Sequence, residues 1–433
     1  MINTLAIIGA QWGDEGKGKM TDLLSQDADL IVRFQGGNNA GHTIKFNGKT
    51  FALHLVPSGI FKDTSSNLLA SGMVIDPEAL YQELKMLETM DIDTEARLWI
   101  ASRAHVVLDF HKTLDALYEE IRSEKIGTTH KGIGPAYTDK AARLGLKMAT
   151  FVSKTGFKTY LDKHLPFVNK LLESYHYAPV KQADLIKKMA PYQAAFKTMI
   201  VDGSKLIDTA IEMGQNVVFE GAQGTMLCLD HGTYPFVTSS SPSAAAIPLN
   251  TGIAPKKIRR VLGILKVYTT RVGGGAFPTE IHDDTAEFIR TKGHEFGTTT
   301  GRARRIGWLD IVQLRHAVRL NGFDAFALML FDVLVGVDTL KLCTAYKLDG
   351  KTIDIIPADH ETLSRCEPVY ETLEGFDDDL DKVDSYKALS NPAKTYIKRI
   401  ETLTNVPVAY ISTGPDRTAI IKRDEIIAKT LKE

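Results

Sequence analysis

The 433-residue sequence has little of what marks secreted, membrane-spanning or nucleic-acid-binding proteins. Its three cysteines, Cys228, Cys343 and Cys366, form no C-x-x-C pair, so neither a disulfide framework nor a cysteine-based zinc site is indicated. No apolar run reaches about 18 residues, so no membrane-spanning helix is predicted. The formal net charge of −1 argues against a dedicated nucleic-acid or membrane-surface protein. No charged and then apolar leader opens the chain, and we expect a cytoplasmic location.

Buried apolar runs recur along the chain, and each is followed by a loop of glycine, acid, amide or hydroxyl residues. Such runs predict strands at residues 4–9, 29–34, 67–70, 216–219, 260–268, 326–331 and 408–411. Helical spacing and capping residues predict helices at residues 16–25, 105–125 and 308–320, and one that starts at Asp76-Pro77. Residues 150–215 are rich in lysine and have helical periodicity.

This alternation predicts an α/β fold with a large, mostly parallel central sheet, flanking helices and a helical insertion. Ligands of such sheets bind at the carboxyl ends of the strands, here at an edge like that of P-loop NTPases. Because no repeat or low-complexity linker divides the chain, we predict one domain over residues 1–433, with a mostly helical subdomain at about 105–215.

The segment Gly13-Asp14-Glu15-Gly16-Lys17-Gly18-Lys19 follows the first predicted strand. It matches G-x-x-x-x-G-K, the spacing that lets backbone N–H groups surround phosphate oxygens. The Ser or Thr that normally follows, as a Mg²⁺ ligand, is replaced by Met20, and a carboxylate lies inside the loop instead. The segment therefore predicts a phosphate site with an added acid; the alternative is a tight strand-to-helix turn.

A second loop, residues 36–42, contains His42 and follows the strand at 29–34. Asp14 and His42 would then form an acid/base pair on adjacent loops. A single histidine is more often a surface or structural residue, and that alternative stays open.

Three further segments carry signals, and the strongest anion signal among them is at residues 297–305. Residues 126–135 are rich in glycine and hydroxyls, which suits a phosphate cradle, a mobile lid or an ordinary flexible loop. Residues 297–305 place three arginines within four positions between glycines, which suits carboxylate or phosphate recognition or a solvated basic turn. Asp332 follows a predicted strand and could accept two hydrogen bonds from a guanine edge.

Taken together, these loops resemble the adenylosuccinate synthetase family over most of the chain. The matching segments are residues 11–19, 35–43, 126–137, 219–224, 230–240, 263–280, 297–308 and 411–417. The resemblance implies that IMP, L-aspartate and GTP are converted to adenylosuccinate, GDP and phosphate. It also implies that Asp14 takes the N1 proton of IMP, that the 6-oxyanion attacks the γ-phosphate of GTP with His42 donating to it, and that the aspartate amine then displaces phosphate.

The resemblance assigns binding residues for each substrate. For IMP they are Asp14, Glu15, Gly16, Lys17, Asn39, Ala40, Gly41, His42, Thr129, Arg143, Gln223, Thr238 and Arg302. For aspartate they are Thr298, Thr299, Thr300, Gly301, Arg302, Ala303 and Arg304. For GTP they are Gly13, Asp14, Glu15, Gly16, Lys17, Gly18, Lys19, Gly41, His42, Thr43, Arg304, Leu330, Phe331, Asp332, Ser412, Thr413 and Gly414.

The resemblance also implies one Mg²⁺ per subunit, held by the Asp14 carboxylate and the Gly41 carbonyl, while Lys17 neutralises the transferring phosphate. It implies a homodimer in which Arg143 reaches the IMP site of the neighbouring subunit.

Two alternative functions compete with adenylosuccinate synthesis. A phage-type synthetase that aminates a guanine nucleotide typically lacks the loop Asp, and a GTP-dependent switch would keep the hydroxyl after Lys19 and an Asn-Lys-x-Asp-like motif.

The sequence departs from the family pattern at four places. Leu330 replaces the usual Lys two residues before Asp332, and Lys131 replaces an Arg. Residues 241–246 (SPSAAA) replace a segment that usually holds Asn and a Gly pair, and Ala303 replaces the second Arg of its loop.

The departure at residue 330 generates a first prediction. Leu330→Lys restores a cationic stem beside the predicted guanine site, and we expect it to lower the KM for GTP several-fold, on the order of 1 kcal/mol of added binding. Steady-state kinetics with GTP and with ATP, at fixed IMP and aspartate, measure this. An unchanged KM for GTP would show that the pocket compensates elsewhere.

Overall fold

The computed structural model describes residues 3–46, 49–296 and 303–432. Packing of the backbone divides the chain into two compact units, which are described separately. Unit one consists of Met1–Leu24, Gly221–Ala246 and Ile258–Glu433, and unit two of Ser25–Glu220 and Ile247–Lys257. The interpretation of residues 1–433 as one domain with a helical subdomain stays a prediction.

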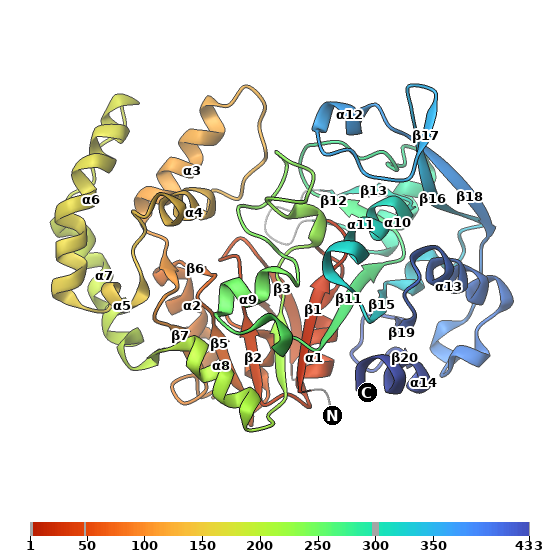
Figure 1. Cartoon of the computed structure of the whole chain (residues 1–433), viewed down its shortest axis with the longest axis horizontal. Coiled ribbons are helices and arrows are strands. Elements are labelled where there is room, and N and C mark those ends of the chain that lie inside the picture. Colours follow the sequence, from red (N-terminus) through yellow and green to blue (C-terminus); the bar gives the residue numbers. More distant parts are fainter. Residues whose placement is uncertain (1–2, 47–48, 297–302, 433) are drawn as a thin grey trace. The chain divides into compact units, whose positions relative to one another are not determined.

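The strands of the main sheet lie in the order β20-β19-β15-β11-β1 in unit one and β10-β2-β5-β7-β9 in unit two (Figure 1). The pairs described within each unit are parallel, except that β20 runs antiparallel to β19. The predicted α/β fold with a large, mostly parallel sheet is therefore confirmed.

Unit one supplies half of these strands. They are β1 (Thr4–Gly9), β11 (Arg260–Lys266), β15 (Ala325–Met329), β19 (Val408–Ser412) and β20 (Ile420–Lys422). Every residue of β1, β15 and β19 is buried, which explains why these strands appear in the sequence as continuous apolar runs. The strand predicted at 260–268 ends two residues early, because β11 ends at Lys266, and a separate strand begins beyond it at Thr269.

Unit two supplies the other half. Its strands are β10 (Val217–Glu220), β2 (Leu30–Arg33), β5 (Ser66–Leu69), β7 (Leu98–Ala101) and β9 (Ile200–Val201). The first three lie within about one residue of the predicted strands. The strands β7 and β9 are short, and no sequence signal had indicated them.

The helices of unit two begin with α2 (Pro77–Glu88), where the predicted Asp76 cap is confirmed by its contacts with the backbone N of Glu78 and Ala79. The others are α3 (Asp109–Ile121), α4 (Ile133–Ala142), α5 (Met148–Phe151), α6 (Lys154–Ser174), α7 (Gln182–Phe196), α8 (Gly203–Glu212) and most of α9 (Ala246–Thr251). Figure 1 shows α5, α6 and α7 side by side. In α6, Phe157, Leu161 and Leu165 recur every four residues and are buried, which gives this helix its apolar face.

The helices of unit one are α1 (Lys17–Ser25), α10 (Asp284–Lys292), α11 (Ile311–Asn321), α12 (His360–Ser364), α13 (Asn391–Thr404) and α14 (Asp424–Ile427). The helix predicted at 308–320 begins three residues later than expected, because β14 (Leu309–Asp310) precedes it. The side chain of Asp310 caps the helix by accepting from the backbone N of Gln313.

Smaller sheets complete the fold. The strands β16 (Thr339–Leu348), β17 (Lys351–Ile353) and β18 (Glu367–Glu374) form an antiparallel sheet that β14 joins, and none of them was predicted. Two-stranded pairs are formed by β12 (Thr269–Arg271) with β13 (Arg305–Gly307), β3 (His42–Phe46) with β4 (Lys49–Leu53), and β6 (Val74–Ile75) with β8 (His105–Val106).

Asp310 is 1% exposed and lies where β14 meets α11. Its Oδ2 accepts from the Tyr346 hydroxyl at 2.5 Å and from the Gln313 amide at 2.9 Å. Burial outweighs these hydrogen bonds and raises the pKa of Asp310 to about 7. The folded protein therefore favours the protonated acid, and stability is lost as pH rises from the unfolded value near 3.8 towards 7.

We therefore predict that Asp310→Asn removes a pH dependence of stability. Between pH 5 and 7 the wild-type free energy of unfolding should fall by about 2–3 kcal/mol relative to the variant, at ~1.4 kcal/mol per pH unit. Urea unfolding at several pH values measures this. Asp359→Asn is the matched control, because Asp359 caps α12 at the surface and its pKa is lowered by the hydrogen bond from Thr362. Parallel curves for wild type and Asp310→Asn would contradict the prediction.

Candidate functional site

The predicted phosphate loop connects β1 to α1 in unit one. Gly13 and Gly16 have φ angles of 88° and 85°, which glycine adopts without strain. Asp14 has a φ of 57°, a left-handed conformation that few non-glycine residues adopt. The loop therefore holds the predicted base in a constrained backbone, as is common at functional sites.

The carboxylate of Glu15 is fully buried inside this loop. Its Oε1 accepts from the backbone N of Gln11 at 3.0 Å and of Gly13 at 2.9 Å, and its Oε2 lies 2.5 Å from the Lys17 ammonium. A Cβ atom at Gly224 would lie 2.4 Å from Oε1. Glu15 thus organises the loop from within, and only a residue without a side chain fits beside it.

Lys19 joins the phosphate loop to the loop after β19. Its ammonium donates to Ser412 Oγ at 2.8 Å and to the carbonyl oxygens of Gly414 at 2.7 Å and Ala419 at 3.0 Å. Burial lowers the pKa of Lys19 to about 8, although nearby Asp332 acts in the opposite direction. The structure therefore brings together Lys19, Ser412 and Gly414, three residues that were predicted to bind GTP.

The segment after β15 carries the predicted guanine site. Leu330 is half-buried with a φ of 57°, and a short 3₁₀ helix follows at Phe331–Leu334. Phe331 stacks on Phe376 with ring centroids 4.6 Å apart. Burial raises the pKa of Asp332, against the charges of Lys19 and Lys292.

Arg304 contacts two carboxylates of unit one. Its Nη1 donates to Glu295 Oε2 at 2.5 Å, and its Nε lies 3.0 Å from Asp14 Oδ2. Burial by itself would lower the pKa of Arg304. The two carboxylates outweigh burial, so the pKa of Arg304 is raised. The residue predicted to bind aspartate is therefore paired with the predicted base. Thr298, Thr299, Thr300, Gly301 and Arg302 lie outside the described residues.

Glu295 belongs to none of the segments that the sequence singled out. It is 1% exposed, and its Oε1 accepts from the Lys266 ammonium at 2.8 Å and the Tyr268 hydroxyl at 2.6 Å. Lys266 itself is fully buried at the end of β11. An apolar strand that ends in lysine, followed 29 residues later by an isolated acid, offers no local signal for such a pair.

An aromatic and cationic stack supports the loop at Trp12. The guanidinium of Arg271 lies 4.7 Å from the Trp12 ring centroid, and Thr233 Oγ1 accepts from both side chains. Gln223, predicted to bind IMP, has a φ of 55° and packs against Gly13. Thr238 is half-buried, and its backbone N donates to the carbonyl of Leu227 at 3.0 Å.

In unit two, the loop at residues 36–42 is fixed by contacts behind it. Asn38 donates to Asp76 Oδ2 at 2.9 Å, and Asn39 Oδ1 accepts from the backbone N of Gly37. His54 Nδ1 lies 2.7 Å from the Ala40 carbonyl.

Gly41 is exposed beside His54. The backbone of His42 and Thr43 forms the start of β3, whereas their side chains lie outside the described residues.

The segment at residues 126–143 also lies in unit two. Thr129 is exposed, and Arg143 is exposed in the left-handed C-cap position of α4, with a φ of 66°. Asp139, on the last turn of α4, accepts from His111 Nε2 and His164 Nε2, both at 3.1 Å. These two hydrogen bonds tie α4 to α3 and α6 and so fix the helix end from which Arg143 projects.

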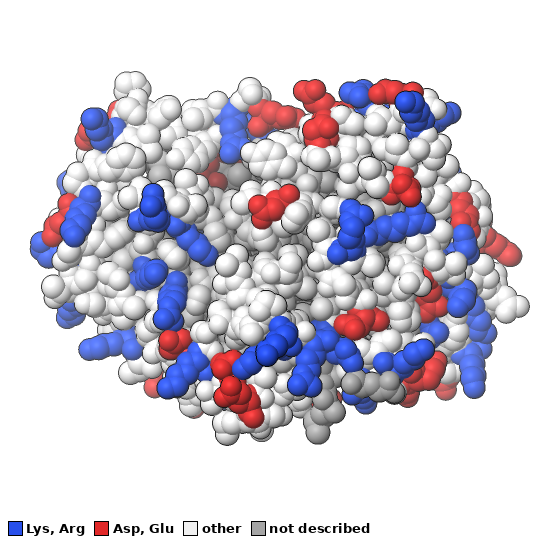
Figure 2. Space-filling view, viewed as in Figure 1, with Lys and Arg blue, Asp and Glu red and all other residues white. Residues whose placement is uncertain are grey.

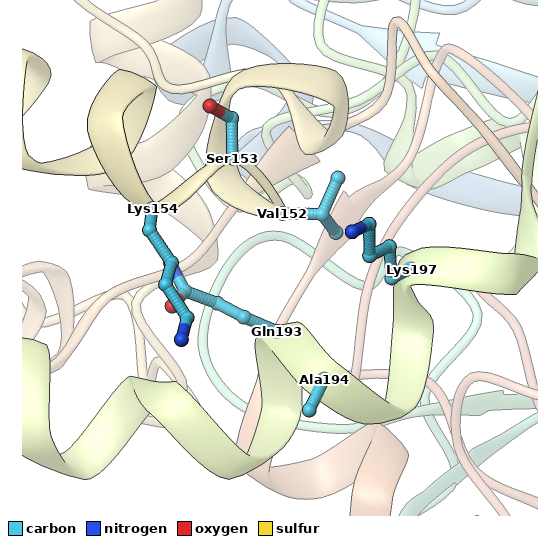
Figure 3. Close-up of a pocket in the computed structure, with 6 residues that line it drawn as sticks. All are labelled: Val152, Ser153, Lys154, Gln193, Ala194 and Lys197. Carbon is cyan, nitrogen blue, oxygen red and sulfur yellow. The ribbon is translucent and has the colours of Figure 1, made fainter.

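Figure 2 shows basic and acidic side chains intermixed on one face. Figure 3 shows a cavity of unit two that contains none of the predicted site residues and is lined by Val152, Ser153, Lys154, Gln193, Ala194 and Lys197.

Some features are absent from the described part of the chain. It contains no group of three or more histidines, cysteines or acids that could hold a metal ion by themselves. None of its helices is both long and apolar enough to cross a membrane.

The sequence profile of the adenylosuccinate synthetase family matches residues 6–421. An adenylosuccinate synthetase of Listeria monocytogenes serotype 4a (strain HCC23) is 50% identical over 425 residues, which are 97% of this chain and 99% of that protein. That of Bacillus cytotoxicus is 47% identical over 419 residues, or 96% and 97% of the two chains.

Solved structures agree with these matches. The fully ligated adenylosuccinate synthetase of Plasmodium falciparum has a TM-score of 0.92 at 37% identity and covers 97% of this chain and 100% of its own. The succinoaminodeoxyadenylate synthetase of cyanophage S-2L has a TM-score of 0.60 at 19% identity over 99% of both chains, a likeness in fold alone. The resemblance found in the sequence is confirmed. The chain therefore belongs to the adenylosuccinate synthetase family, the ligases that join L-aspartate to IMP with GTP as the energy donor.

Proposed function

We propose that Asp14 is the base that activates IMP. The observation that carries this proposal is the placement of its carboxylate inside the phosphate loop, 39% exposed and 3.0 Å from Arg304. Removal of the N1 proton makes O6 of IMP a nucleophile, which attacks the γ-phosphorus of GTP. The bond to the bridging oxygen breaks, and GDP leaves. The amine of aspartate then attacks C6 and displaces phosphate, giving adenylosuccinate.

Residues of unit one are proposed to bind the triphosphate and the base of GTP. Lys17 offers a cation for the transferring phosphate, and its short contact with Glu15 supports this by fixing the ammonium at the loop. Asp332, Ser412 and Gly414 are proposed to meet guanine. The contact of Lys19 with the latter two supports a shared site for phosphates and base.

The family also implies Mg²⁺, and the donor chemistry of this chain fits that ion. Mg²⁺ at nucleotide sites usually takes one or two carboxylates, with phosphate oxygens and water completing its octahedral shell. Asp14 offers one exposed carboxylate and Gly41 an exposed backbone carbonyl, and we propose both as ligands. When bound, Mg²⁺ supplies positive charge against the charge that develops on the transferring phosphate.

His42 is proposed to donate a hydrogen bond during phosphoryl transfer, and Asn39, Thr129, Gln223, Thr238 and Arg302 to hold IMP. The residues at 298–304 are proposed to bind the carboxylates of aspartate. The hydrogen bond from Arg304 Nη1 to Glu295, and the position of its Nε 3.0 Å from a second carboxylate, support this assignment.

We also propose a homodimer in which Arg143 serves the IMP site of the neighbouring subunit. Its exposure at the fixed end of α4 supports a contact outside its own chain. The proposed compartment is the cytoplasm, a location consistent with three buried, unpaired thiols.

The two alternative functions are less well supported. The cyanophage enzyme is described as bound to dGMP and dATP, whereas this chain keeps the loop Asp that suits deprotonation of IMP. A GTP-dependent switch is not favoured, because the curated relatives are synthetases along their whole length.

We predict that Asp14→Asn abolishes turnover, with kcat reduced by about 10³-fold or more, because the amide cannot accept the N1 proton. The Kd for IMP, measured by calorimetry, should change by less than about fivefold. Aspartate-dependent phosphate release measures turnover. Asp63→Asn, at an exposed position, is the matched control. A rate near that of wild type in Asp14→Asn would contradict the assignment of the base.

A further inference from the structure

Arg304 is held at two points by one buried residue. Its Nη1 donates to Glu295 Oε2 at 2.5 Å, and its backbone N donates to the Glu295 carbonyl at 2.9 Å. Phe296 and Ala303 pair as an antiparallel bridge beside these contacts. Glu295 therefore fixes both the main chain and the side chain of Arg304.

The other carboxylate oxygen of Glu295, Oε1, is held by two further hydrogen bonds. The ammonium of Lys266 and the hydroxyl of Tyr268 both donate to Oε1, at 2.8 and 2.6 Å. Lys266 and Glu295 are each about 1% exposed, so this ion pair has little screening by water. The charges of Lys266 and Arg304 outweigh burial and lower the pKa of Glu295, which keeps it ionised.

The guanidinium of Arg304 has N–H donors beyond the one that contacts Glu295. Its Nε lies 3.0 Å from Asp14 Oδ2, yet the Nε–H finds no hydrogen-bond acceptor among the described residues although it is buried. A guanidinium has five N–H donors in a planar fork. With Nη1 committed to Glu295, the Nε–H is left without an acceptor next to Asp14, where the reaction is proposed to occur.

We propose that Glu295, anchored by Lys266, is the positioning residue for Arg304. Glu295 keeps its hydrogen bond from Arg304 Nη1 throughout the reaction. The Nε side of Arg304 then exchanges Asp14 for a carboxylate of the substrate aspartate, while the guanidinium keeps its orientation. This inference rests on the proposed role of Arg304 in binding aspartate. It assigns a specificity role to Glu295, a buried residue that none of the matching segments includes.

Glu295→Gln tests the inference, because it keeps the shape of the side chain and removes its charge. The KM for aspartate should rise about 10- to 100-fold, the loss expected for one charge-assisted hydrogen bond, while the KM values for IMP and GTP stay within about threefold. Equal increases for all three substrates would overturn the inference, since a purely structural role predicts no such split.

A double-mutant cycle shows whether Glu295 acts through Arg304. The aspartate KM of Glu295→Gln with Arg304→Leu should lie within about twofold of that of Arg304→Leu alone. Additive increases would overturn the inference. A normal aspartate KM in Arg304→Leu would instead overturn the proposed role of Arg304. A raised KM in Arg304→Leu with a normal KM in Glu295→Gln would overturn only the role of Glu295.

Two further variants keep the test decisive. Glu295→Asp preserves the charge but withdraws it by one methylene, and we expect an intermediate rise in the aspartate KM. If Glu295→Gln does not fold, as judged by thermal unfolding, a normal aspartate KM in Glu295→Asp overturns the inference. Glu361→Gln, the same substitution at an exposed position of α12, is the matched control and should leave all three KM values unchanged.

Discussion

The buried carboxylate of Glu15 is the contact on which the rest of the phosphate loop depends. A charge removed from water must be paired and hydrogen-bonded, and here two backbone amides and Lys17 do so. These contacts fix the loop at its centre, and they leave no room for a side chain at Gly9 or Gly224. The left-handed conformation of Asp14, and with it the direction of its carboxylate, follows from the shape of that loop.

Beside this loop, four charged side chains of unit one form ion pairs. Lys266 and Arg304 face Glu295 and Asp14, so two cations meet two carboxylates without an unpaired charge. Such a network orients its members more strongly than a surface pair would, since water does not compete for the same donors. Arg304 can therefore serve a substrate carboxylate in a set direction.

Much of the fold and the site could be predicted from the sequence. The buried strands at 4–9, 325–329 and 408–412 produce continuous apolar runs, although the run at 326–331 extended the predicted strand two residues too far, and capping residues such as Asp76 mark helix starts. The strands β16 to β18 were not predicted, because the alternation in β16 is interrupted between Cys343 and Ala345, where its register with β18 shifts. The contacts of Lys19 could not be predicted either, because its partners lie far along the chain. Those of Glu295 could not be predicted because no motif marks this residue.

The sequence by itself determined the family, the class of fold and the phosphate loop, because these depend on local spacing and on apolar periodicity. The tertiary structure decided which groups face Asp14 and how they are held. Lys266, Glu295 and Arg304 come from three segments, and only the packing of β11, α10 and β13 brings their charges within hydrogen-bonding distance. Electrostatic strength at such sites depends on burial and on distances of a few ångströms, which residue order does not specify.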